Sequence, residues 1–76
     1  MNKKRRTELR EVISKLDDCR TAIDMILSEE ADCLGNMPEN LEYSEQYEKM
    51  EEVVDNLEEA LDEIDSVIDS LESAVR

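Results

Sequence analysis

Apolar residues recur every three or four positions along the first half of the chain. The members of this first series are Leu9, Val12, Leu16, Cys19, Ile23, Ile26 and Cys33. One step of the pattern is broken at Glu30, where an apolar residue is due. Because an α-helix turns once every 3.6 residues, the spacing places the series on one helix face. Ile13, Leu27 and Leu34 lie beside it, so this face is wider than the seam of a two-stranded coiled coil.

The first helix is expected to span residues 4–34. Asn2 and Thr7 both suit its N-cap, since either side chain can accept a hydrogen bond from a backbone N–H of the first turn. Gly35 is the only glycine, and it follows the last apolar residue of the helix. A left-handed residue commonly ends a helix at this point, and glycine adopts that conformation at least cost. The pattern therefore predicts that Gly35 is left-handed.

A connector over residues 35–43 leads to a second predicted helix over residues 44–75. Ser44 is a good N-cap, and Glu45 and Glu48 complement the positive end of the helix dipole. The apolar series of this helix has no break and comprises Tyr47, Met50, Val54, Leu57, Leu61, Ile64, Ile68, Leu71 and Val75. A flanking series widens it and comprises Val53, Ala60, Val67 and Ala74.

These elements predict an all-α domain over residues 1–76, an antiparallel two-helix hairpin. The short connector requires the helices to run side by side in opposite directions. Two helices cannot cover two wide apolar faces, so we expect two hairpins to dimerise into a four-helix bundle. The rival is a monomer whose apolar face docks on another protein. The expected oligomer core comprises Leu9, Leu16, Ile23, Ile26, Met50, Val54, Leu57, Leu61, Ile64, Ile68 and Leu71.

Composition supports a small helical protein and argues against other classes. Of 76 residues, 39% are hydrophobic and 41% are charged, which excludes a large core. Trp and Phe are absent, and one Gly and one Pro are too few for a turn-rich β-protein. The sequence has no run of about 18 apolar residues, the length needed to cross a bilayer, and its basic start is not followed by an apolar signal region. We therefore expect a cytoplasmic protein without a membrane partner.

The net charge of −13 is distributed unevenly along the chain. Residues 1–20 hold seven bases and four acids, which gives +3, whereas residues 21–75 hold eighteen acids and one base, which gives −17. Such an acidic surface repels nucleic acid and attracts basic proteins. The sequence therefore predicts a basic protein partner and no direct binding of nucleic acid.

A second stripe of three-and-four steps on the second helix consists of acids only. Its members are Glu48, Glu51, Asp55, Glu58, Asp62, Asp65, Asp69 and Glu72. We expect this acidic stripe to lie opposite the apolar face and to bind the partner. The alternative is that it only solvates the helix, although a solvated face would ordinarily mix Lys with Glu and gain pair energy.

Candidate chemistry is sparse. Cys19 and Cys33 are separated by about 21 Å along one helix, too far for a disulfide, and are expected to be buried thiols. The chain has no His, which removes the usual zinc sets and His-based catalytic triads. Two helices also offer little concavity for a substrate. We expect no metal, no cofactor and no enzymatic activity.

Two smaller groups of residues have open interpretations. Met37, Leu41, Tyr43 and Tyr47 surround the connector, where they could cap the bundle or anchor a binding patch. Basic side chains from opposed hairpins could instead hold the phosphates of a nucleotide, which would make the protein a small-ligand sponge. These basic residues are Arg5, Arg6, Arg10 and Arg20.

Three segments carry a resemblance in layout and turn motif. They are MNKKRR at residues 1–6, NMPENLEYSEQYE at 36–48 and DNLEEA at 55–60. The chain resembles small acidic helical-hairpin proteins of bacterial prophages and mobile elements. In kind, it is similar to phage anti-defence inhibitors such as anti-CRISPR proteins, which block a basic nucleic-acid groove. The resemblance implies a phage-encoded inhibitor of a host defence protein in the host cytoplasm. The alternative is a self-assembling structural bundle with a merely solvating acidic surface.

Overall fold

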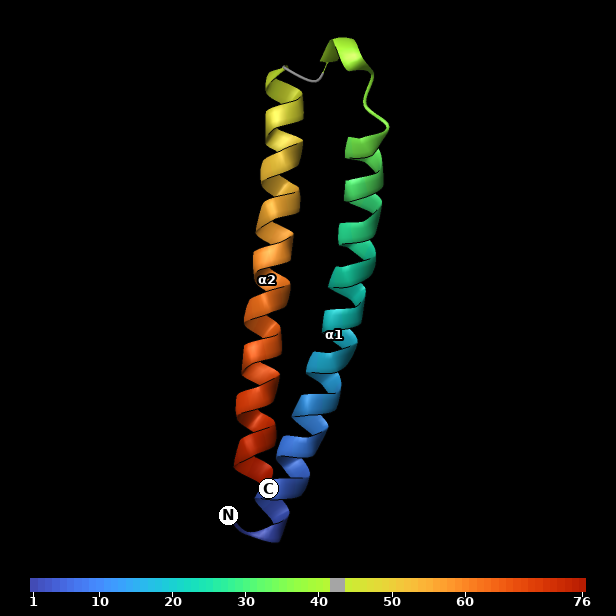
Figure 1. Cartoon of the computed structure of the whole chain (residues 1–76). Coiled ribbons are helices and arrows are strands. Elements are labelled where there is room, and N and C mark those ends of the chain that lie inside the picture. Colours follow the sequence, from blue (N-terminus) through green and yellow to red (C-terminus); the bar gives the residue numbers. More distant parts are fainter. Residues whose placement is uncertain (42–43) are drawn as a thin grey trace.

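The computed structural model is a helical hairpin and describes residues 1–41 and 44–76. Its elements are α1 (Lys3–Gly35), the short 3₁₀ turn η1 (Glu39–Leu41) and α2 (Glu45–Val75). The two long helices run side by side in opposite directions, so both termini lie at one end of the molecule (Figure 1). The hairpin measures 59 × 15 × 13 Å. The predicted all-α hairpin is confirmed.

Each long helix begins at a side chain that caps its first turn. Asn2 Oδ1 accepts a hydrogen bond from the backbone N of Arg5 at 2.8 Å, and Ser44 Oγ accepts one from the backbone N of Tyr47 at 3.1 Å. Each bond satisfies a donor that has no partner within the helix. The choice between Asn2 and Thr7 is therefore decided for Asn2, and the predicted cap at Ser44 is confirmed.

The C-terminal end of α1 differs from the prediction. The helix includes Gly35, and no described glycine has a positive φ. Asn36 ends the helix with φ −96° and ψ 5°, and its backbone N–H donates to Asp32 O at 3.0 Å. The prediction of a left-handed Gly35 is wrong, because Gly35 is still helical and the chain leaves the helix one residue later, at Asn36, through the bridge region between helical and extended conformations.

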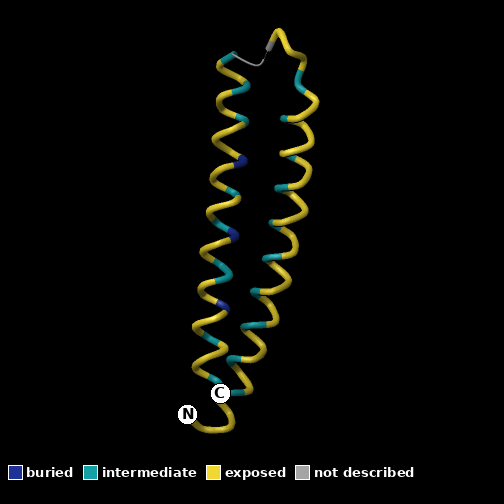
Figure 2. Tube along the Cα trace, viewed as in Figure 1, coloured by how far each residue is buried: buried dark blue, intermediate teal, exposed yellow. Residues whose placement is uncertain are grey.

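The α2 side of the helix interface follows the predicted series. Val54, Leu61 and Ile68 are each 8% exposed and are the buried apolar residues of the described chain. The remaining members, from Tyr47 to Val75, are half-buried (Figure 2). We call this series, with the α1 residues that face it, the seam.

The α1 side of the seam differs from the prediction. Its half-buried residues are Arg6, Leu9, Ile13, Leu16, Arg20, Ile23, Leu27, Glu30 and Leu34. Val12, Cys19, Ile26 and Cys33, which were expected on the central stripe, are exposed. The apolar sector of α1 is three columns wide, and a single neighbouring helix covers only two of them. The predicted flank therefore faces α2, and four of the seven residues of the predicted stripe lie outside the seam.

Leu61 provides a test of the seam. Because Leu61 is buried, Leu61→Ala should lower the free energy of unfolding by about 2–5 kcal/mol. The control is Met25→Ala on the outer surface of α1, where Met25 is 63% exposed and the change should stay within about 0.5 kcal/mol. Urea unfolding followed by circular dichroism at one fixed protein concentration measures both. Equal losses would show that the seam is not the core.

Gly35 provides a second test. The position is helical, and a Cβ added there meets nothing within 4 Å. Gly35→Ala should therefore raise the free energy of unfolding by about 0.4–1 kcal/mol, because alanine loses less chain entropy on folding. A lower stability, measured by the same urea titration, would mean that the residue is left-handed after all.

Candidate protein-binding faces

The outer surface of the hairpin has one face on each side of the seam, and the backs of the helices lie between these two faces. Seam residues occupy heptad positions a and d, with Arg6 and Tyr47 both at a. When two such helices run antiparallel, the e positions of both lie along one side of the seam and the g positions of both lie along the other. Position b borders e on the helix surface, and c borders g. We call the e and b side the acidic face and the g and c side the apolar face.

All eight carboxylates of the predicted stripe fall at positions b and e of α2. They therefore lie beside the seam, on the acidic face, and not opposite the apolar residues as predicted. Seven are exposed, namely Glu48, Glu51, Asp55, Glu58, Asp62, Asp69 and Glu72. The α1 part of this face adds Asp17 and Asp24 and the bases Lys3 and Arg10. Ten acids against two bases give the acidic face a formal charge of −8.

The eighth carboxylate, Asp65, is engaged within the hairpin. Arg20 Nη2 donates to Asp65 Oδ2 at 3.3 Å, and Arg20 Nε donates to Asp65 Oδ1, so the pair is bidentate. The hydrogen bond to Asp65 and the attraction of its charge raise the pKa of Arg20, and Asp24 and Asp17 add to the effect. The side chains of Arg20 and Asp65 are 38% and 45% exposed. Asp65 therefore serves to join the helices, which was not predicted.

A sequence signal for this pair existed at Arg20. Arg20 falls four residues after Leu16 and three before Ile23, which is a seam position in an otherwise aliphatic run. A charged residue at such a position needs a partner from the facing helix. The signal was missed because the predicted stripe was centred on Cys19, one residue away.

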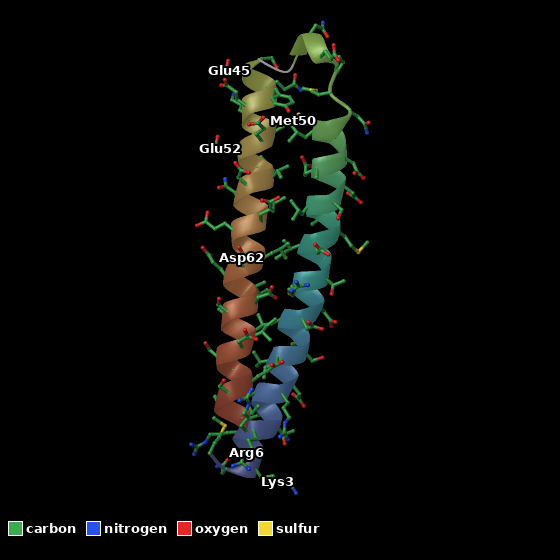
Figure 3. All side chains as sticks on the ribbon, viewed as in Figure 1. Lys3, Arg6, Glu45, Met50, Glu52 and Asp62 are labelled. Carbon is green, nitrogen blue, oxygen red and sulfur yellow. The ribbon has the colours of Figure 1, made fainter. Side chains whose placement is uncertain are left out.

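Of the four arginines proposed for phosphate binding, Arg5, Arg6 and Arg10 lie in the first turns of α1, and only Arg20 lies apart from them. Arg20 pairs with Asp65, and it is about 15 Å along the helix from Arg10. Arg6 lies at the end that holds the termini, as does Lys3, whereas Glu45 and Glu52 lie toward the connector (Figure 3). Arg6 Nε is enclosed and has no hydrogen-bond partner among the described residues. The phosphate site was expected between opposed hairpins, and the structure of one hairpin does not test it, so it stays a prediction.

Apart from Gln46, the g positions of the apolar face after Arg5 carry small or medium-sized apolar side chains. The α1 members are Val12, Cys19, Ile26 and Cys33, and the α2 members are Val53, Ala60, Val67 and Ala74. The exposed fractions of Val12, Ile26, Val53 and Val67 lie between 43% and 50%. The prediction of buried thiols is wrong for the hairpin, because Cys19 and Cys33 are exposed on this face.

The charges on the apolar face cancel. Positions g and c include the bases Arg5, Lys15 and Lys49 and the acids Glu8, Glu29 and Glu63. Three bases and three acids give a formal charge of zero. The hairpin therefore has one strongly acidic face and one that is apolar and neutral overall.

The structure describes only part of the proposed connector patch. Met37 and Tyr47 are half-buried near the connector, and Met50 points toward α1 on the next turn (Figure 3). Leu41 ends η1, but its side chain lies outside the described residues, as does the whole of Tyr43. The described pair is compatible with a cap at this end of the seam.

The remaining features of the described residues do not assign a function to the hairpin. Among the described residues, no three His, Cys, Asp or Glu side chains are arranged to hold a metal ion. Neither long helix, over the residues described, is long and apolar enough to cross a membrane. Comparison with protein-family models, curated proteins and solved structures finds no match to this chain. The resemblance to prophage hairpins therefore stays a prediction.

The Arg20–Asp65 pair can be tested with a double-mutant cycle. Arg20→Gln and Asp65→Asn should each lower stability, and the double variant should lose less than the sum of the two, because the groups interact directly. The control cycle uses Lys49→Gln and Glu45→Gln, an exposed pair within α2 at 3.5 Å, for which we expect a smaller coupling. Urea unfolding measures both cycles. Strict additivity at positions 20 and 65 would contradict the pairing.

Proposed function

We propose that this chain is a non-catalytic binding protein whose acidic face docks on a basic protein. The observation that carries the proposal is the file of seven exposed carboxylates on α2, on a face with a formal charge of −8. No base stands at the b or e positions of α2 to relieve their repulsion. Like charges three or four residues apart cost a few tenths of a kcal/mol each, so the file is unfavourable for the helix itself.

The spacing of the seven exposed carboxylates supports a partner protein with a groove that binds nucleic acid. Neighbouring carboxylates on such a helix are about 5–6 Å apart, which is similar to the spacing of phosphates along a nucleic-acid strand. A basic groove that binds phosphates would attract this face and orient it before contact. Inhibition of a host defence protein in the host cytoplasm is the specific form of this proposal, and it rests on the resemblance to prophage hairpins.

The proposal includes pairing of two hairpins into a four-helix bundle. Only Val54, Leu61 and Ile68 are buried among the described residues, which is a small core for a chain of this length. A second candidate function, a self-assembling bundle with a solvating acidic surface, draws on the same observation. If the acidic face binds a partner, binding depends on where the acids lie. If the acids only solvate the surface, only their number matters.

Two variants of equal charge separate these functions. The face variant carries Asp55→Asn, Glu58→Gln, Asp62→Asn and Asp69→Asn. Asp65 is left intact because it pairs with Arg20. The control variant carries Asp18→Asn, Asp32→Asn, Glu52→Gln and Glu59→Gln, all at exposed f positions on the backs of the helices. Each variant changes the net charge from −13 to −9.

Capture from bacterial lysate, quantified by mass spectrometry, identifies the partner, and association kinetics then compare the three proteins. The face variant should associate about tenfold more slowly than the parent, and salt should produce the same effect in the parent. The control variant should stay close to the parent, and both variants should be slightly more stable. Equal binding by both variants would contradict docking through the acidic face and favour the solvating function.

A further inference from the structure

The hairpin exposes more surface than a compact protein of its mass. Its accessible surface is 5875 Å², whereas the usual relation between mass and area gives about 4,800 Å² for a monomer of 8.8 kDa. The excess of about 1,100 Å² is similar to the roughly 800 Å² that each partner buries in a stable interface. An interface of ordinary size would therefore bring the exposed area into the normal range.

Charge shows which face a second copy can occupy. Two acidic faces at −8 each would repel one another, whereas two apolar faces are neutral and carry complementary side chains of both signs. The apolar face also holds the exposed Val12, Ile26, Val53 and Val67, which gain by leaving water. Charge and apolar area therefore indicate the same face.

We propose that a second copy of this chain docks on the apolar face, with each α1 packed against the α2 of the other copy. This inference rests on the proposed pairing of hairpins and assigns its interface. α1 holds seven bases and eight acids, whereas α2 holds one base and twelve acids, so stacking α1 on α2 keeps the two acidic helices apart. Each of these contacts is also antiparallel, which is favourable for the helix dipoles.

Side-chain size supports the same arrangement. From Val53 onward the g positions of α2 alternate Val with Ala, whereas those of α1 include the larger Ile26 with Val12 and the two cysteines. Larger side chains of one helix can then fill the spaces beside the alanines of the other. The resulting bundle would expose its two acidic faces on opposite sides, so that one dimer presents two docking surfaces for a basic partner.

Adjacent residues of α1 provide a matched test. Ile26 is 50% exposed on the apolar face, and Met25 is 63% exposed at position f on the back of the helix. Ile26→Lys should weaken the dimer at least tenfold, whereas Met25→Lys, with the same charge change, should leave it intact. Sedimentation equilibrium at tens of micromolar measures the mass, which should be twice 8.8 kDa for the parent. Circular dichroism checks that both variants remain helical.

The thiols provide a second readout in the unaltered chain. Cys19 and Cys33 lie at g positions of the apolar face, so the dimer should shield them. Their reaction with the thiol reagent DTNB should become at least tenfold slower as protein concentration rises through the range of dimer formation. This measurement remains informative even if Ile26→Lys does not fold.

A monomeric parent, an assembly of more than two copies, equal weakening by both lysine variants, or thiols that react equally fast at all concentrations would overturn the inference. A monomer that captures another protein through Ile26 would assign the apolar face to that protein. These measurements use the hairpin alone, without a basic partner, so they test the interface separately from the proposed function. If the protein is a dimer but the face variant binds a partner as well as the control variant does, only the proposed function is refuted. If the protein is a monomer and the face variant binds more slowly than the control variant, only the interface is refuted.

Discussion

Each helix of the hairpin has apolar residues in three columns along its length, but each has only one neighbouring helix. A single neighbour covers positions a and d and leaves the third column, at g, in water. This shortage of neighbours explains why only Val54, Leu61 and Ile68 are buried among the described residues and why no residue of α1 is. The remaining properties of the molecule depend on where the uncovered column lies.

The antiparallel pairing places both uncovered columns on the same side. Turning one helix end over end relative to the other brings g next to g and e next to e. As a result, Val12 and Ile26 of α1 share a face with Val53 and Val67 of α2, and the acids of both helices share the other. The same amino acids in a parallel pair would mix the two kinds of column, and neither an apolar nor an acidic face would form.

Arg20 lies at the boundary between the seam and the acidic face. It interrupts an aliphatic seam, and its long side chain reaches the acidic face to bind Asp65 with two hydrogen bonds. The pair is half-exposed, so its contribution to stability is moderated by solvent. The pair joins the helices but does not by itself fix their register, because Glu58 and Glu72 occupy the same heptad position as Asp65 one heptad to either side. It also removes one carboxylate from the acidic stripe, so that seven remain for a partner.

The sequence by itself determined the two helices, the N-cap of α2 and the residues that α2 contributes to the seam, because helix periodicity and capping depend on residues within a few positions of one another. Ser44 and the unbroken series from Tyr47 to Val75 are examples. Only the tertiary structure decided which two columns of α1 face α2, that Cys19 and Ile26 are exposed, and that Asp65 pairs with Arg20. These features depend on the rotation of one helix about its axis relative to the other. A wide apolar sector leaves that rotation open until side chains of the facing helix, such as Asp65 opposite Arg20 and 45 residues away in the chain, are in place.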